Sequence, residues 1–353
     1  MKDMHAIIPP VDVELIKAEL TEDKKFMDTN KGHNEIYIVT WHDSPNVVTE
    51  VGRLREIAFR EAGGATGLPC DLDEYDKMEK PYSQLIVWDP DAEAIIGGYR
   101  YLLGSDATFD QDGQPRLASS HQFRFSDKFI KDYLPYTVEL GRSFVAQEYQ
   151  SSKAGAKAIF ALDNLWDGIA SLVYTHPRIM YFFGKVTVYP SFDPVSKDLL
   201  MHFMWKHFGD REGLVRPYKM IMPASDPALM DLLLHKDDFK EDLKLLKEAI
   251  RRRGTNIPPL FNSYMSTSPT LLMMGTALNE GMSNIEDTAI LVCYNEMYEE
   301  KKARHIESYV RYRLERLRVR FPLLDPEVES RIIDKWNTRK ESWYRRIKDR
   351  LGR

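Results

Sequence analysis

The sequence predicts an α/β fold in which a mixed, largely antiparallel sheet is flanked by helices, with further helices added at the C-terminal end. The segment SQLIVWDPDAEAIIGGYRYLL (83–103) has two apolar runs around an Asp-Pro-Asp turn, which indicates a hairpin and therefore antiparallel pairing. Segments of helical periodicity alternate with segments rich in β-branched and aromatic residues. The 353 residues, 43% of them hydrophobic, are enough to bury a sizeable core.

In the N-terminal part, we expect a helix over 11–28 and a strand over NEIYIVTW (34–41), which is dense in β-branched and aromatic residues. The next segment, 46–64, has apolar residues that recur every three or four positions and predicts an amphipathic helix. The pair Gly63-Gly64 is expected to end this helix.

The elements after the hairpin are expected to alternate. A loop over 105–117 precedes the strand TVELGRSFVAQ, and the polar loop SSKAGAK then opens a helix. The other expected elements are a strand over 179–189, helices over 194–208 and 226–253, an ordered segment beginning at IPPLFNSYM, a strand over 288–295 and helices beyond Glu296. We expect one catalytic-type domain over 1–300 and a helical extension over 301–353.

The C-terminal extension differs in charge from the rest of the chain. Residues 301–353 contain 17 Lys and Arg against 8 Asp and Glu, whereas the whole chain has a net charge of −5. A basic segment of this kind can meet an acidic protein, an anionic membrane or nucleic acid. Equally, it can be a solvated helical face that packs on the domain through its apolar residues.

Several classes of protein are disfavoured. No run approaches about 18 apolar residues, and the N-terminus lacks the order of a signal peptide, so we expect a cytoplasmic protein, with contact to the inner membrane left open. Cys70 and Cys293 argue against a disulfide scaffold and give no metal-ligand spacing. The sequence has neither a nucleotide-binding glycine loop, nor HExxH, nor a G-x-S-x-G elbow. We therefore expect no metal and no permanently bound cofactor.

Charged residues at the ends of the expected core elements form the main candidate site. They are Arg55, the acids of DLDEYD, Arg100, Glu139 and Arg142. Side chains three apart on a regular strand point to opposite faces, so Glu139 and Arg142 reach one cleft only if a bulge intervenes, for which Gly141 is a natural place. Neighbouring arginines are expected to keep Glu139 ionised. The other interpretation is an ion-pair network that only ties the strand to its neighbours.

The polar loop SSKAGAK is a second candidate site, one that would bind an anion. Small residues and lysines at the start of a helix favour the binding of an anion, because the free backbone N–H groups and the helix dipole point at the ligand. Lys153 and Gly155 would then lie beside a phosphate or pantetheine arm.

Blocks along about residues 34–300 resemble the bacterial N-acyltransferases that make lipoamino acids, namely the ornithine N-acyltransferases and their glycine-acylating relatives, often labelled hemolysin-like. More distantly, the early blocks resemble acyl-homoserine lactone synthases. All of these have the GNAT fold. The blocks are RLREIAFREAGG, DLDEYD, IIGGYRYLL, VELGRSFVAQEYQ, NLWDGIASLV, YFFGKVTV and IPPLFNSYM.

The resemblance implies transfer of a fatty or 3-hydroxyacyl group from the phosphopantetheine thioester of acyl carrier protein to the α-amine of an amino acid, in membrane lipid synthesis. The matching positions include Arg100, Glu139 and Arg142, which we expect to be the catalytic residues. From the chemistry, Glu139 is the candidate base, directly or through a water, while Arg142 and Arg100 would hold the acids in place and one of them would bind the acceptor carboxylate. The GNAT pyrophosphate loop is not intact in SSKAGA, which fits a carrier-protein donor better than coenzyme A. The resemblance also implies Arg55, Phe59, Asp73 and Asp76 for substrate. From the chemistry, we expect backbone N–H groups near Ser143, Phe144 and Val145 to polarise the thioester carbonyl, and Lys153 and Gly155 to lie beside the pantetheine arm. The acyl chain needs an apolar tunnel, and the candidates for its lining, although such residues are more often plain core, are Trp166, Ile169, Phe182, Phe183 and Val186.

Three rival hypotheses remain. A homoserine lactone synthase is disfavoured by the long chain after residue 200 and by the LWDGI and IPPLF blocks. A non-catalytic module that binds acyl groups or carrier protein is disfavoured by the presence of Arg100, Glu139 and Arg142, because a binding role does not require these charged residues. A nucleic-acid binder with a basic tail predicts steep salt dependence and no acyl product, and nucleic acid is the partner that we expect least.

Overall fold

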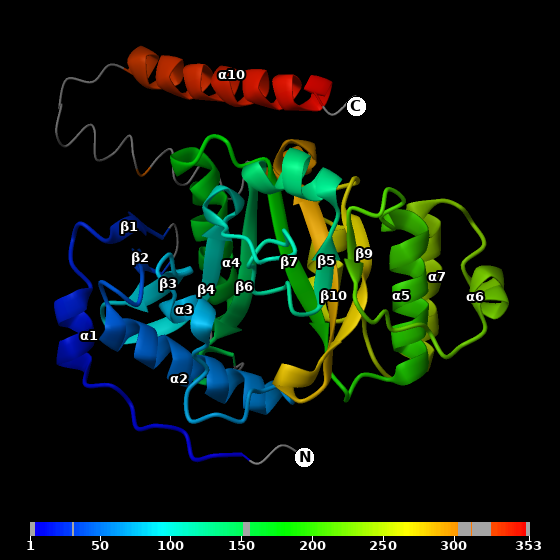
Figure 1. The fold of residues 1–353 in the computed structure, drawn as a ribbon, viewed down its shortest axis with the longest axis horizontal. Helices are drawn as coiled ribbons and strands as arrows, with labels where there is room; N and C mark the ends of the chain where they lie inside the picture. The colour runs from blue at the N-terminus through cyan, green and yellow to red at the C-terminus, as the bar shows by residue number, and fades with distance from the viewer. Residues whose placement is uncertain (1–3, 30–31, 151–155, 303–311, 313–325, 351–353) are drawn as a thin grey trace.

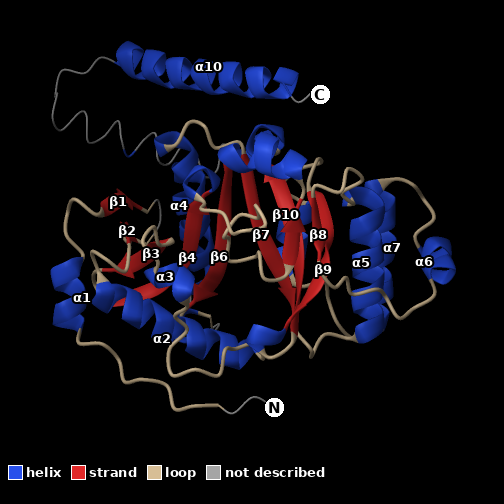
Figure 2. Ribbon diagram, in the orientation of Figure 1, coloured by secondary structure: helices blue, strands red, loops and turns tan. Residues whose placement is uncertain are grey.

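A computed structural model describes residues 4–29, 32–150, 156–302, 312 and 326–350. A single eight-stranded sheet in the order β1-β2-β3-β4-β6-β7-β10-β9 forms its centre (Figures 1 and 2). The strands of this sheet are β1 (Lys25–Asp28), β2 (Glu35–Val39), β3 (Ser83–Asp89), β4 (Ala94–Leu103), β6 (Thr137–Val145), β7 (Tyr181–Val188), β9 (Leu272–Asn279) and β10 (Ile285–Cys293). A small second sheet pairs β5 (Phe123–Phe125) with β8 (Val215–Pro217).

Helices pack on the sheet through apolar faces. Buried residues of α1 and α2 share one apolar cluster with β2, β3 and β4, whereas α4 and α5 belong to a different cluster that also includes β7 and β10. Gly63, with φ of +85°, ends α2 in the left-handed conformation, as expected from the sequence. The helices are α1 (Val13–Glu19), α2 (Pro45–Ala62), α3 (Glu74–Lys77), α4 (Ala156–Thr175), α5 (Pro194–Phe208), α6 (Pro227–Leu233), α7 (Phe239–Arg252), α8 (Pro259–Met265) and α10 (Pro326–Arg350).

The strands β6 and β7 are the one parallel pair of the eight-stranded sheet. They pair only over Thr137–Leu140 and Tyr181–Gly184, with α4 as the crossover between them. All other neighbours in this sheet pair antiparallel, which confirms the predicted mixed, largely antiparallel sheet with flanking helices. Among the described residues, β6 has no strand neighbour on its β7 side beyond Leu140.

Three sequence predictions differ from the structure. The helix expected over 11–28 ends at Glu19, and Lys25–Asp28 instead pair with β2 as an edge strand. The helix expected over 226–253 is divided into α6 and α7 by a turn in which Asp237 has φ of +53°. Strand β9 was not expected, because its sequence LMMGTALN has mixed propensities and gains its strand conformation from pairing with β10.

The described part of the C-terminal extension is mainly α10, which lies along one end of the sheet (Figure 1). Its Ile347 is buried in a cluster with Tyr181 and Cys293. Lys340 is also buried, and its Nζ donates to the carbonyl oxygens of Pro177, at 3.1 Å, and Ile179. None of the described helices is long and apolar enough to cross a membrane.

Candidate active site

A cleft of about 250 Å³ opens beside β6, and the sequence-predicted residues Asp73, Arg100, Glu139 and Arg142 all line it. Further lining residues come from β7 and from the loops around Ala118 and Met282. The structure therefore brings together charged residues that lie far apart in the chain.

A bulge in β6 makes this arrangement possible. Gly98 pairs with Phe144 and Arg100 pairs with Gly141, so β6 has one residue more than β4 over this interval. The bulge follows directly after Gly141, the residue that the sequence indicated as a natural place for it, and Arg142 adopts the left-handed conformation there, with φ of +50°. The bulge changes the alternation of side chains, and Arg142 thereby faces the same cleft as Glu139.

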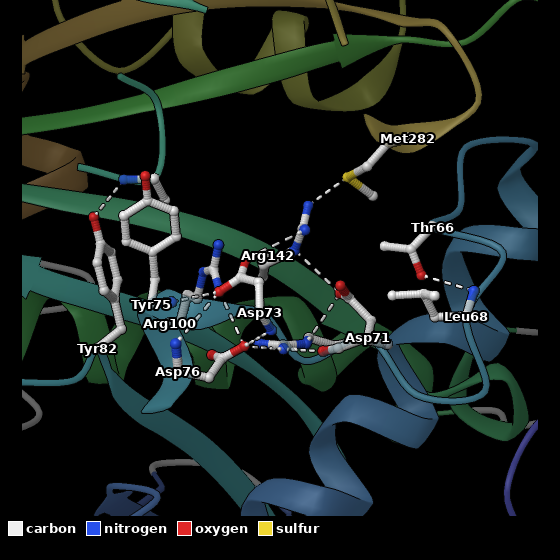
Figure 3. A network of polar contacts seen from close by, with 12 residues as sticks. Thr66, Leu68, Asp71, Asp73, Tyr75, Asp76, Tyr82, Arg100, Arg142 and Met282 are labelled. Atoms are coloured by element: carbon white, nitrogen blue, oxygen red, sulfur yellow. Dashed lines mark hydrogen bonds and ion pairs between the residues drawn. The ribbon is translucent and has the colours of Figure 1, made fainter. Parts of the chain in front are cut away.

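Three arginines and three aspartates form a network on one side of the cleft. Figure 3 labels the three aspartates and two of the arginines, Arg100 and Arg142. Arg100 Nη1 donates to Asp73 Oδ1 at 2.7 Å and to Asp76 Oδ2 at 3.2 Å. Arg142 Nε lies 3.1 Å from Asp71 Oδ2, and its Nη2 lies 3.6 Å from Asp73 Oδ2. These contacts tie α3 and the chain before it to β4 and β6.

Arg55 completes the network from α2 and is fully buried. Its Nη2 lies 3.0 Å from Asp76 Oδ2 and its Nε 3.3 Å from Asp71 Oδ2. No face of Arg55 is open to the cleft, so the structure shows it as a partner of the aspartates rather than as a lining residue.

The sequence DLDEYD places its acids by forming a short capped helix. Asp73 is the N-cap of α3, and the Asp76 side chain accepts in return from the Asp73 backbone N–H, which makes a capping box. Although burial opposes ionisation, Arg55 and Arg100 hold the pKa of Asp76 well below its usual range. In the same way, despite burial, Arg100 lowers the pKa of Asp73.

Glu139 lies on the other side of the cleft and is held by neutral donors. Its carboxylate accepts from the Tyr82 hydroxyl and from the backbone N–H groups of Ala118 and Ser119, each N···O distance being 3.1 Å. No arginine of the described residues pairs with it, which differs from the expectation that arginines keep Glu139 ionised. The turn at Ala118 follows a loop that sequence reasoning treated only as a connection.

Two other lining residues, Lys185 and His121, were missed at the sequence level. Lys185 Nζ lies 3.1 Å from Asp287 Oδ2 and also donates to Gln122. Partial burial and the Lys185 charge lower the pKa of the His121 imidazole to about 4. Lys185 is a cation within the apolar strand YFFGKVTV, a signal of the same kind as Glu139 in its own strand.

The predicted substrate-binding residues beyond the network have varied surroundings. Phe59 and Phe144 are buried in the apolar cluster that α2 forms with the sheet. Ser143 and Val145 are partly exposed on β6, in the part of the strand for which the described residues supply no neighbour on the β7 side. The loop that contains Lys153 and Gly155 lies outside the described residues.

The candidate acyl-chain residues line only a small space. Trp166, Phe182 and Phe183 border a cavity of about 20 Å³, and Trp166 packs against Tyr264 with ring centroids 5.9 Å apart. Ile169 and Val186, also considered as lining residues, are buried in the main core. This cavity is too small for a fatty acyl chain, so a chain can enter it only if the side chains that border it move.

Among the described residues, no group of three or more His, Cys, Asp or Glu has a metal-binding arrangement. Cys70 and Cys293 are both free thiols. The chemical groups that the cleft offers are thus a buried carboxylate, guanidinium and ammonium groups, an imidazole and the open backbone edge of β6.

Residues 54–158 match the family model described as an acetyltransferase (GNAT) domain. The chain is 54% identical over 316 residues to a glycine N(alpha)-acyltransferase of Phocaeicola vulgatus, covering 90% of this chain and 97% of the relative. It is 57% identical over 308 residues to a protein of the same name from Bacteroides thetaiotaomicron, covering 87% and 91% respectively. No solved structure matches the chain. On this identity and coverage, the chain belongs to the family of GNAT-type N-acyltransferases that includes these two relatives.

Proposed function

We propose that this chain transfers a fatty acyl group from the phosphopantetheine thioester of acyl carrier protein to the α-amine of glycine. The observation that carries the proposal is the high identity, over nearly the full length, to two relatives that are named for glycine Nα-acylation. Ornithine, the other acceptor that the sequence blocks suggested, has no such support from the relatives. The proposed product is an N-acylated amino acid destined for membrane lipid.

Glu139 is the proposed base. The amine nitrogen attacks the thioester carbonyl, a C–N bond forms, the C–S bond breaks, and the amine proton is passed to the departing thiolate through the base. The two oxygens of Glu139 already accept from Tyr82, Ala118 and Ser119, so the carboxylate is held in one orientation. Its remaining acceptor capacity is directed to the amine, or to a water that contacts the amine.

The unpaired edge of β6 is the proposed place for the thioester. Backbone N–H groups near Ser143 to Val145 would polarise its carbonyl, and a pantetheine arm would lie along the opening between β6 and β7. The opening begins directly after Leu140, next to Glu139, so the attacked carbon and the base would lie close together. The same opening would lead the acyl chain toward Trp166 and Phe183.

Arg142 is the proposed ligand of the acceptor carboxylate. It is the most accessible of the three network arginines, with 17% of its side chain exposed against 3% for Arg100. Within the described part of the chain, its Nη1 donates only to the thioether sulfur of Met282, a weak acceptor, so a carboxylate would be a much better partner there. Asp73, Asp76, Arg55 and Arg100 would then act as positioning residues.

The test is a reconstituted reaction with purified protein, measured by mass spectrometry. Acyl carrier protein and coenzyme A thioesters of the same chain are each offered with glycine, ornithine or no acceptor. We expect N-acylglycine, formed at least tenfold faster from the carrier-protein thioester. Preference for ornithine would overturn the proposed acceptor, and preference for coenzyme A would overturn the proposed donor.

Expression in a host that lacks such lipids provides the second test. A new N-acylated amino acid in the lipid extract identifies the acceptor and the chain length together. Protein that binds acyl carrier protein but forms no product in either experiment would favour a non-catalytic binding module instead.

A further inference from the structure

We infer that α6 and α7 together form a docking surface for an anionic lipid bilayer, at the end of the molecule that lies beyond β9 (Figure 1). The inference uses residues outside the cleft and does not depend on the proposed reaction. Two independent features of this region support it, an exposed apolar face on α6 and a row of cations on α7 that form no ion pair within the described residues.

The apolar face of α6 consists of leucines that the rest of the described protein leaves uncovered. Leu229, Leu232 and Leu233 are 59%, 72% and 50% exposed, although Met230 on the same helix is buried. Their spacing of three and four residues puts the leucines on one side of α6. Contiguous exposed apolar side chains in a folded protein mark a contact surface for another phase or another molecule.

The cationic row on α7 has the same helical periodicity. Lys240, Lys244, Lys247 and Arg251 follow one another at spacings of four, three and four residues and border a shallow groove. No ion pair joins any of these four to a carboxylate in the part of the chain that the structure describes. Glu248 and Arg252 line the same groove, and they pair with each other at 2.5 Å.

The two helices are fixed to each other through α5. Lys206 of α5 donates to the carbonyl oxygen of Leu234, directly after α6, at 2.6 Å and to Asp242 of α7 at 2.9 Å. Buried residues on both helices, Met230 and Leu246, belong to the same apolar cluster. The leucine face and the cationic row therefore belong to one unit.

An anionic bilayer is the partner that satisfies both features. Leucines can enter the interface between headgroups and acyl chains, while lysines remain at the level of the phosphates. An acidic protein or a nucleic acid would use the cations and leave the leucines in water. The C-terminal extension is also basic, with 17 Lys and Arg against 8 Asp and Glu, so the test has to separate that region from α7.

Vesicle co-sedimentation of the full-length protein tests the inference. The probes are vesicles of phosphatidylcholine alone and vesicles that contain phosphatidylglycerol. We expect binding only to the second kind. The triple variant Lys240→Gln, Lys244→Gln, Lys247→Gln should bind roughly 100-fold more weakly, because each cation near the surface contributes roughly a fivefold factor. The pair Leu229→Ser, Leu232→Ser should weaken binding at least tenfold at equal salt.

The matched control removes the same number of cations from α10 with Arg331→Gln, Lys335→Gln and Arg339→Gln, all of which are exposed. We expect this variant to bind like the wild type. Loss of binding in the α10 variant with none in the α7 variant would overturn the assignment, as would a wild type that ignores both kinds of vesicle. Vesicle binding that depends on the lysines but not on the leucines would show that the leucine face does not enter the bilayer, and would also overturn the inference. Thermal unfolding of each variant checks that the fold is intact.

Discussion

The two sides of the cleft hold their charged groups in opposite ways. On one side, Arg55, Arg100 and Arg142 surround three aspartates, and every charge has a partner of opposite sign within about 3.6 Å. On the other side, Glu139 is held by a hydroxyl and two backbone N–H groups without a cation. The three aspartates are therefore neutralised by guanidinium groups, whereas no cation of the described residues pairs with Glu139, which faces the cleft. We interpret the first side as structural and propose the second side as the place of the chemical step.

The largest expected effect on stability is that of Arg55→Ala. It removes a buried partner of both Asp71 and Asp76, and we expect a loss of about 3–5 kcal/mol in the free energy of unfolding. Urea unfolding measures it, with the exposed Arg331→Ala as the control. A loss below about 1 kcal/mol would mean that the network does not hold the scaffold together.

Arg142→Ala should affect both sides of the comparison. Asp71 keeps Arg55 as a partner, so we expect a smaller loss of about 2 kcal/mol in unfolding free energy. If Arg142 binds the acceptor carboxylate, the KM for glycine should rise at least tenfold in Arg142→Ala. Arg142→Lys retains a positive charge, so its KM for glycine should lie between those of Arg142→Ala and the wild type. An unchanged KM in the Ala variant would remove Arg142 from the acceptor site.

Acid should weaken the network side. The pKa values of Asp73 and Asp76 are lowered in the folded state, so the stability that they contribute is present above the unfolded pKa of about 3.9. It is lost as the pH falls from there toward the folded values. We expect the thermal unfolding midpoint of the wild type to decrease once the pH is lowered below about 4. In Asp76→Asn, the midpoint should decrease less steeply with pH. Parallel pH curves for the two proteins would contradict this linkage.

The smallest effect is expected at His121. Its imidazole is accessible, but with a pKa of about 4 it is neutral at pH 7. We therefore expect no inflection near pH 6.5 in the kcat/KM profile and a change of less than about threefold in His121→Gln. An inflection that disappears in this variant would make His121, and not Glu139, the titrating base.

Much of the fold could be predicted from local patterns. The hairpin around Asp89–Asp91, the amphipathic α2 and its end at Gly63 are each specified by residues close in the chain. Strand β9 and edge strand β1 could not be predicted, because their conformation depends on pairing with strands distant in the sequence.

The candidate site could be predicted in part. The charged residues stood out because acids and arginines are rare in core elements, and the structure does bring Arg100, Glu139 and Arg142 to one cleft. The bulge was foreseen, but its position at Arg142 is set by the register of β4 against β6. The partners of Glu139 were missed, since a backbone N–H at Ala118 or Ser119 leaves no mark in the sequence.

The most direct test of the account is the rate of N-acylglycine formation by Glu139→Gln, measured beside its unfolding free energy. Glutamine has nearly the same size but cannot take the proton. The account predicts a fall in kcat of about 10²–10⁴-fold, with a variant that remains folded. A kcat within threefold of the wild type would contradict it and would leave Glu139 only as the residue that holds the turn at Ala118.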